Sequence, residues 1–362
     1  MRELAPTIFL KRALPQLYKM AVIFDDVGSY PLPEGITREW VKKAFRAYEE
    51  NKRRIQELVG NAIRQKLDAG VELPNYPQFQ DMISQFSEPI LDDSRTEEPF
   101  LVREDVAKIA ELDALEAFAA RYKEEKGEKL RIRVCVTGPI ELYYRIFQPP
   151  VYEDILKNIA KSVQRFVKWS VEHARNYEVA CVCVDEPSLG LDPRIEEEGV
   201  ISALEIATEF AFKHRIDTQI HLHSPIFYET VLNVRSICVI GVESAANPSY
   251  LDLIARERLE EADKFLRVGV ARTDFASMAA EYDEKHNTNV FREGEDALRK
   301  VIDEFNSPEI VCKRMKNAFS KFGSCIKYVG ADCGLGSFPS QALAFSLLKN
   351  TRKGIDAFFA EH

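Results

Sequence analysis

Short apolar, β-branched runs alternate along this chain with longer stretches in which apolar residues recur at helical spacing. The strand-like runs lie near residues 20–27, 69–73, 131–137, 179–185, 218–223, 236–242, 264–271 and 325–331. The helical pattern is clearest in residues 37–68, which follow Thr37, a candidate N-cap, and in residues 340–358. This alternating order predicts a parallel sheet whose strands are joined by helical crossovers.

Eight such units favour a (β/α)8 TIM barrel over an open doubly wound sheet, and no Gly-x-Gly-x-x-Gly follows the first strand. We therefore expect residues 1–362 to form a single barrel domain, with residues 1–19 as an N-terminal extension. Residues 74–129 and 275–311 are too long to be simple connections. We interpret both as insertions on the catalytic face, where lids and substrate loops occur.

Composition narrows the classes of partner and compartment. Hydrophobic residues make up 46% and charged residues 30%, which is enough for a core and a solvated surface. The net charge of -9 argues against a nucleic-acid partner, which needs a basic face. No stretch approaches the ~20 apolar residues of a membrane helix, and the charged, proline-broken N-terminus does not read as a signal peptide. Seven cysteines, mostly in apolar runs, fit a reducing compartment, so we expect a cytoplasmic protein.

Candidate metal ligands follow the predicted strands. His221 and His223, Glu243 and Cys333 stand at the ends of strands five, six and eight, and these ends meet at one mouth of a barrel. Histidines at i and i+2 on a strand point to the same face. Thiolate, imidazole and carboxylate together suit zinc better than calcium or magnesium, which prefer oxygen alone. The alternative is that the histidines are an ordinary barrel-interior or surface pair.

A zinc ion held by thiolate and imidazole stabilises a bound thiolate at neutral pH, just as it acidifies bound water. A thiolate is a strong nucleophile toward an activated methyl group. The ligand set therefore indicates alkyl transfer to sulfur, with hydrolysis by zinc-bound water as the rival chemistry.

Six motifs in order carry a resemblance to a known family. They are Val27-Gly28-Ser29-Tyr30-Pro31, Val136-Thr137-Gly138-Pro139, Val184-Asp185-Glu186-Pro187, His221-Leu222-His223, Val242-Glu243-Ser244 and Asp332-Cys333-Gly334-Leu335. From about residue 20 to the end, the chain resembles the catalytic half of cobalamin-independent methionine synthase. That family is a (β/α)8 barrel related to uroporphyrinogen decarboxylases and to corrinoid-dependent thiol methyltransferases. The resemblance implies a zinc-dependent methyltransferase that acts on a thiol.

The resemblance also implies roles for single residues. His221, Glu243 and Cys333 correspond to zinc ligands. Gly28 and Ser29 correspond to a turn whose backbone amides hold the amino-acid carboxylate, and Asp185 to the partner of its ammonium group. The alternative for Gly28 and Ser29 is an ordinary turn at the end of a strand.

Three departures from the family pattern concern site residues. His223 replaces a ligand cysteine, which removes one negative charge from the ligand set and makes a bound sulfur less nucleophilic. Either the methyl donor is more reactive, or His223 is no ligand and the fourth position is open. Asp274 lies in the loop where the family has a proton-donating histidine. As an acid it needs a raised pKa, and a helix cap or an ion pair with Arg272 is its alternative. Gln78 lies where an acid that contacts the substrate amine is expected, and Gln78 or Asn75 would serve a different thiol or bind the same amino acid less electrostatically.

The fourth departure is the absence of the N-terminal barrel that helps the full-length family enzyme hold its folate donor. A methyl-corrinoid such as methylcobalamin, or a corrinoid protein, is the donor that we expect, because cobalt(I) leaves without a proton whereas the folate nitrogen needs one. The expected acceptor is homocysteine, giving methionine. The alternatives are another thiol such as coenzyme M, a non-catalytic barrel that binds a metal or a corrinoid protein, and a metal-free barrel resembling the decarboxylases.

Overall fold

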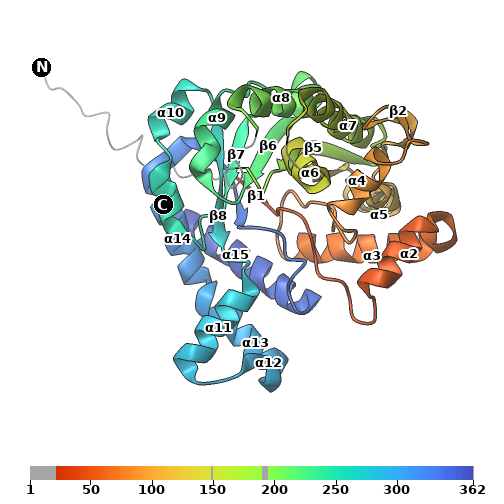
Figure 1. Cartoon of the computed structure of the whole chain (residues 1–362). Coiled ribbons are helices and arrows are strands. Elements are labelled where there is room, and N and C mark those ends of the chain that lie inside the picture. The colour runs from red at the N-terminus through yellow and green to blue at the C-terminus, as the bar shows by residue number, and fades with distance from the viewer. Residues whose placement is uncertain (1–21, 148–149, 190–194, 362) are drawn as a thin grey trace, which may run out of the picture.

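Seven parallel strands form a nearly closed barrel with helices around it. The computed structural model describes residues 22–147, 150–189 and 195–361, so the expected extension at residues 1–19 lies outside it. Within these residues the strand order is β1-β9-β8-β7-β6-β5-β4 (Figure 1). The arrangement confirms the predicted (β/α)8 TIM-barrel class.

The elements occur in the alternating order that the sequence predicted. The barrel strands are β1 (Ile23–Asp25), β4 (Leu130–Thr137), β5 (Tyr177–Asp185), β6 (Asp217–Leu222), β7 (Val239–Val242), β8 (Phe265–Ala271) and β9 (Ile326–Ala331). The helices are α2 (Arg38–Arg46), α3 (Tyr48–Asp68), α4 (Ser84–Ile90), α5 (Ala110–Lys126), α6 (Pro139–Ile146), α7 (Glu153–Glu172), α8 (Glu197–Lys213), α9 (Tyr228–Leu232), α10 (Arg256–Glu261), α11 (Phe275–His286), α12 (Val290–Glu293), α13 (Glu295–Phe305), α14 (Pro308–Phe322) and α15 (Gln341–Glu361). A small antiparallel ribbon joins β2 (Thr96–Glu98) and β3 (Leu101–Val102). The described residues also contain four 3-10 turns: Glu104–Val106, Pro225–Phe227, Pro248–Leu253 and Gly323–Cys325.

The predicted strand at residues 69–73 is wrong. Helix α3 runs to Asp68, and beyond it only Leu73 and Asn75 form isolated parallel bridges, with Asp25 of β1 and Arg133 of β4. Proline at the intervening position has no N–H to donate, which prevents a regular ladder there. The eighth position of the barrel is therefore filled by an irregular segment.

Side-chain hydrogen bonds take over where this ladder is missing. The Asn75 N–H donates to Asp26 Oδ1 over 2.7 Å, and the Cys135 N–H donates to Asn75 Oδ1 over 2.8 Å. The buried Lys66 ammonium donates to Asp26 Oδ2 over 2.6 Å and to the carbonyl of Asn75 over 2.8 Å. These groups connect β1 to β4 through side chains.

A buried layer of charge lies in the barrel below its mouth. Arg267 Nε donates to Asp25 Oδ1 over 2.8 Å, and Arg133 Nε lies 3.7 Å from Asp25 Oδ2. Gly330 leaves room for this layer, because a Cβ there would lie 2.8 Å from Arg267 Nη2 and 2.2 Å from the Asp25 carbonyl oxygen. Paired charges are tolerated in an interior because each partner offsets the other's loss of water.

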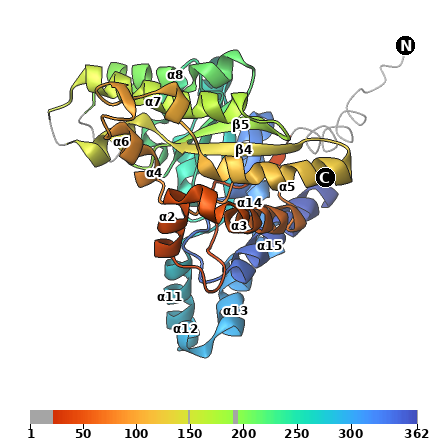
Figure 2. The same ribbon diagram turned by 90° about the vertical axis from the view of Figure 1, so that its right-hand side faces the viewer.

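The two long segments fold into helices. Residues 275–305 form α11, α12 and α13, which project from the barrel (Figure 2). Residues 84–106 form α4, the ribbon and one 3-10 turn, whereas α5 belongs to the ring around the barrel. Helix α2 begins behind Thr37, whose Oγ1 accepts from the Trp40 N–H over 3.1 Å, which confirms the predicted cap. Among the described residues, no helix has the length and apolar character needed to span a bilayer.

Candidate metal and substrate site

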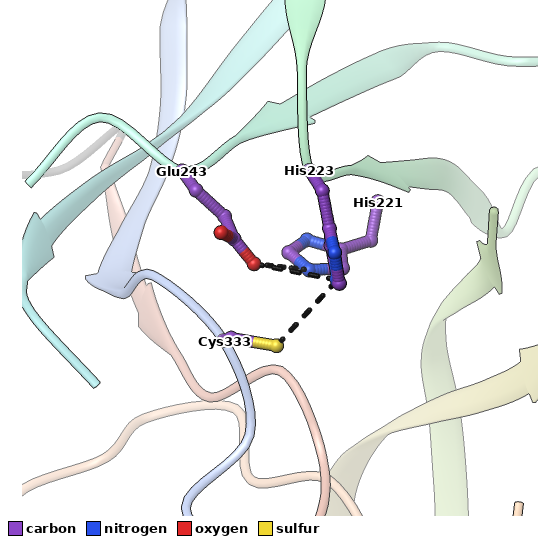
Figure 3. A group of neighbouring side chains, drawn as sticks. All are labelled: His221, His223, Glu243 and Cys333. Carbon is purple, nitrogen blue, oxygen red and sulfur yellow. Dashed lines mark hydrogen bonds and ion pairs between the residues drawn. The ribbon is translucent and has the colours of Figure 1, made fainter. Parts of the chain in front are cut away.

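Four potential ligands converge at the carboxyl end of the barrel. His221 lies in β6 and His223 just beyond it, Glu243 follows β7, and Cys333 follows β9 (Figure 3). One ligand atom from each lies within 4.8 Å of all the others. Glu243 Oε1 is 3.4 Å from Nε2 of each histidine, and Cys333 Sγ is 3.9 Å from His223 Nε2.

Strand register explains why these residues meet. In the ladders, Asp185 of β5 pairs with His221 of β6, and His221 pairs with Gly241 of β7. Because side chains alternate along a strand, His223 shares the inward face of His221, and Glu243 shares that of Gly241. The sequence prediction that these strand ends converge is thus consistent with the observed geometry.

The donor set fits a tetrahedral zinc ion. Zinc bonds of ~2.0–2.1 Å to nitrogen and oxygen separate two ligand atoms by ~3.4 Å, which is the observed Glu243–histidine spacing. His221 is buried, and neither of its ring nitrogens makes a hydrogen bond within the described part of the chain. The nearest acceptor to its Nε2 is Glu243 Oε1, 3.4 Å away. A buried polar group without a hydrogen bond is costly, and a metal ion bound at one ring nitrogen would remove that cost for that nitrogen.

The charges of the site also favour a cation. Burial would raise the pKa of Glu243, but its contacts with His221 and His223 outweigh burial and lower that pKa. Burial raises the pKa of the Cys333 thiol well above its ordinary value, and the negative charge of Glu243 raises it further. Without a cation Cys333 therefore stays a thiol, and a divalent metal would favour the thiolate.

Asp332 anchors the loop that carries Glu243. Its two carboxylate oxygens accept from the N–H groups of Ala245 and Ala246 over 2.8 and 2.7 Å. It reaches them past Gly269 of β8, where a Cβ would lie 1.8 Å from Asp332 Oδ1. Asp332 belongs to one of the sequence motifs, but no role was predicted for it. Gly269, on the strand between Asp332 and Ala245, is the residue that could have indicated this contact.

Asp185 lies beside the cluster with a free oxygen. It is the register partner of His221, and its Oδ1 is buried without a hydrogen-bond partner among the described residues. Burial raises its pKa, while the neighbouring His221 and His223 oppose that rise. The adjacent Glu186 is fixed instead, because its carboxylate accepts from the first turn of α6 at the N–H groups of Ile140 and Glu141. Asp185 is therefore the acid that remains available to a ligand.

A pocket of ≈310 Å³ places two further predicted residues near Cys333. Ser29, Gln78 and Cys333 line it together. Gly28 packs against Gln78, because a Cβ on Gly28 would lie 1.8 Å from Gln78 Oε1. Gln78 has a φ of 50° and donates from Nε2 to the Cys135 carbonyl over 3.2 Å. Ser29 Oγ accepts from the Gly336 N–H over 3.2 Å, which ties the turn to the loop that follows Cys333.

Asp274 stands apart from this pocket. Its Oδ1 and Oδ2 accept from Arg272 Nε and Nη2 over 3.0 and 2.7 Å, and Arg272 also pairs with Glu281. Asp274 is not among the residues that line the ≈310 Å³ pocket. The ion pair with Arg272, the alternative considered from the sequence, is observed, and the role as a proton donor stays a prediction.

Comparisons with known proteins identify solved structures that share the fold of this chain. No protein-family model matches the chain, and no curated protein matches its sequence. A solved B12-independent methionine synthase from Shewanella sp. W3-18-1, in complex with selenomethionine, superposes with a TM-score of 0.61 at 15% identity, covering 94% of this chain and 98% of that one. A methyltransferase from Methanosarcina mazei gives a TM-score of 0.53 at 13% identity, covering 92% and 94%. At these identities the likeness establishes a shared fold.

Proposed function

We propose that this protein is a zinc-dependent methyltransferase that moves a methyl group onto the sulfur of a thiol, with homocysteine as the acceptor. The observation that carries the proposal is the cluster of His221, His223, Glu243 and Cys333 at the barrel mouth, with Cys333 also lining a pocket. The chemistry that zinc supplies in such a site is the stabilisation of a thiolate at neutral pH. The two solved neighbours, a methionine synthase and a methyltransferase by name, agree with this reading.

The chain's own residues would bind and orient the amino acid. Asp185, with its free buried oxygen beside His221, would pair with the ammonium group. The turn at Gly28 and Ser29 would hold the carboxylate through backbone N–H groups. Gln78, on the wall of the same pocket, would add a neutral hydrogen bond. A site fixed by Asp332 and Gly336 requires little rearrangement when the ligand enters.

A methyl-corrinoid, free or bound to a protein, is the proposed donor. No histidine occurs in residues 269–274, and the one acid there, Asp274, forms an ion pair with Arg272. A leaving group that requires no proton suits this arrangement. The Shewanella protein is named B12-independent, so methyl-folate is the second donor to be tested.

Coenzyme M is the alternative acceptor. It has no ammonium group, and the neutral Gln78 stands where the family resemblance predicts an acid. The free oxygen of Asp185 favours homocysteine, because a buried carboxylate without a cation is costly. A non-catalytic barrel that binds a metal or a corrinoid protein would not require this substrate cradle.

The test is methyl transfer by the zinc-loaded full chain. Methylcobalamin and methyl-tetrahydrofolate are offered separately with homocysteine or coenzyme M, and loss of the methyl-cobalt absorbance and formation of the thioether are followed. We expect Cys333→Ser to lower the rate at least about 100-fold, because loss of a direct ligand should cost more than the ~10–100-fold that follows loss of a group hydrogen-bonded to a ligand. Cys238→Ser, which changes a cysteine just before the amino end of β7, is the matched control and keeps the wild-type rate. Equal rates in Cys333→Ser and the wild type, or no transfer with any pair, would overturn the proposal.

A further inference from the structure

A groove of ≈890 Å³ adjoins the pocket that contains Cys333. It lies between α2, α4 and the segment 79–81. Four residues line both spaces: Arg38, Phe79, Gln80 and Asp81. The volume is within the ~300–1,000 Å³ range of small-molecule sites. A ligand in the groove can therefore extend to the candidate site.

The groove is lined by more cationic than acidic side chains, although the protein as a whole is negatively charged. Five cationic residues line it against three acidic ones, although the chain as a whole carries -9: Arg38, Lys42, Arg46, Arg95 and Lys108, against Glu39, Asp81 and Glu88. Arg38, Lys42 and Arg46 recur at every fourth position of α2 and so share one face. Arg46 lies 3.3 Å from Glu88, but Lys42 has no ion pair within the described ranges. An excess of positive charge along a groove raises the local concentration of anionic ligands.

The groove also has an apolar side. Phe79, Phe86 and Pro89 are buried beneath it, and Phe45 of α2 is half-buried. Apolar side chains at the base and cations at the rim match a ligand with an apolar ring system and anionic substituents. A ligand with no apolar part would leave the partly exposed ring of Phe45 in contact with water.

We propose that this groove binds the anionic part of a small-molecule methyl donor, namely carboxylate or phosphate groups attached to an apolar ring system. Arg38 lines both spaces. It would therefore lie between the anionic part of the ligand in the groove and the reacting methyl group in the pocket of Cys333. The identity of the ligand as a donor rests on the proposed function. The binding of the anion does not.

The test is equilibrium binding of two donors to the zinc-loaded full chain. Methylcobalamin carries a phosphodiester, and methyl-tetrahydrofolate triglutamate carries several carboxylates. Lys42→Glu should weaken the binding of at least one of them about fivefold or more, and added salt should weaken wild-type binding. Lys43→Glu is the matched control, because Lys43 is the next residue of α2, pairs with Glu39 and does not line the groove. Its effect should stay below about twofold.

Lys42→Gln, which removes the charge without reversing it, should give a smaller loss and shows whether a folding defect explains Lys42→Glu. No binding of either donor to the wild type, or equal losses at positions 42 and 43, would overturn the groove assignment. Charge-dependent binding at Lys42 without methyl transfer to any thiol would support the groove and overturn the proposed reaction. Methyl transfer that does not depend on Lys42 would support the proposed reaction and overturn the groove assignment.

Discussion

The two walls of this barrel are built in different ways. The wall of β6, β7, β8 and β9 is a continuous parallel ladder, and the four candidate ligands extend from three of its strand ends. The opposite wall, between β1 and β4, has an irregular segment in place of a strand, held by Lys66 and by side-chain hydrogen bonds of Asn75 and Asp26. Backbone pairing thus positions the metal site, whereas buried side chains position part of the substrate pocket.

The difference has a consequence for substitution. On the ladder wall, each strand end is fixed by many backbone hydrogen bonds, so a ligand substitution should remove metal binding and leave the fold intact. On the irregular wall, a few backbone hydrogen bonds remain, to the carbonyls of Phe24 and Pro74, and polar side chains make the other connections. Removing one of them leaves its partner buried without compensation, which costs more than an ordinary hydrogen bond.

The largest expected effect is that of Lys66→Met on the irregular wall. The Lys66 ammonium is fully buried and donates to Asp26, to the Gly28 carbonyl and to the Asn75 carbonyl. Methionine keeps most of the side-chain volume but leaves Asp26 buried without its cation. We expect the free energy of unfolding, measured with urea, to fall by ~3–5 kcal/mol.

Lys52→Met on the same helix is the control, because 41% of the Lys52 side chain is exposed and its carboxylate partners are 3.7 Å away. Its effect should stay within ~1 kcal/mol. Similar losses for the two variants would contradict the account of the irregular wall.

A smaller effect concerns Glu111, which lies under the segment that carries Gln78. It is fully buried, its Oε1 accepts from the Gln80 N–H over 3.0 Å, and burial raises its pKa to about 7. A raised pKa in the folded state stabilises the protein below the ordinary pKa of 4.5, and this contribution is lost as the pH rises through about 7. Between pH 5 and 8, the wild type should lose ~2 kcal/mol more stability than Glu111→Gln.

Urea unfolding of both proteins at pH 5 and pH 8 checks this difference, and the other titrating groups cancel because both chains share them. If the free energy of unfolding falls by the same amount in both proteins between pH 5 and pH 8, Glu111 is not the group whose titration changes the stability. The KM for homocysteine is a second measurement. In Glu111→Gln it should change more than kcat if Glu111 acts by holding the segment that carries Gln78.

The ladder wall could be predicted from the sequence because its rules are local. Each apolar run ends in a polar residue, parallel strands align their carboxyl ends, and side chains alternate, so His221, Glu243 and Cys333 had to lie near one another. The barrel class follows from the same alternation of strands and helices. The sequence could not tell whether His223 joins the cluster; in the structure its Nε2 lies 3.4 Å from Glu243.

The irregular wall could not be predicted, because its contacts depend on residues far apart in the chain. Lys66 lies in a helix whose pattern gives a lysine no reason to be buried, and its partner Asp26 is 40 positions away. The segment 69–73 reads as a strand by composition, yet its backbone makes only an isolated bridge, in which the N–H groups of Glu72 and Leu73 both donate to the Phe24 carbonyl. Asp332 could be found only by knowing that Gly269 leaves a passage to Ala245.

X-ray absorption at the zinc edge tests the central claim most directly. For the purified, zinc-loaded protein, we predict one zinc ion per chain, one sulfur neighbour at ~2.3 Å and nitrogen or oxygen neighbours at ~2.0–2.1 Å. In Cys333→Ser the sulfur neighbour should disappear, while Cys238→Ser keeps it. A protein that holds no stoichiometric zinc, or a spectrum whose sulfur neighbour survives Cys333→Ser, would contradict the account.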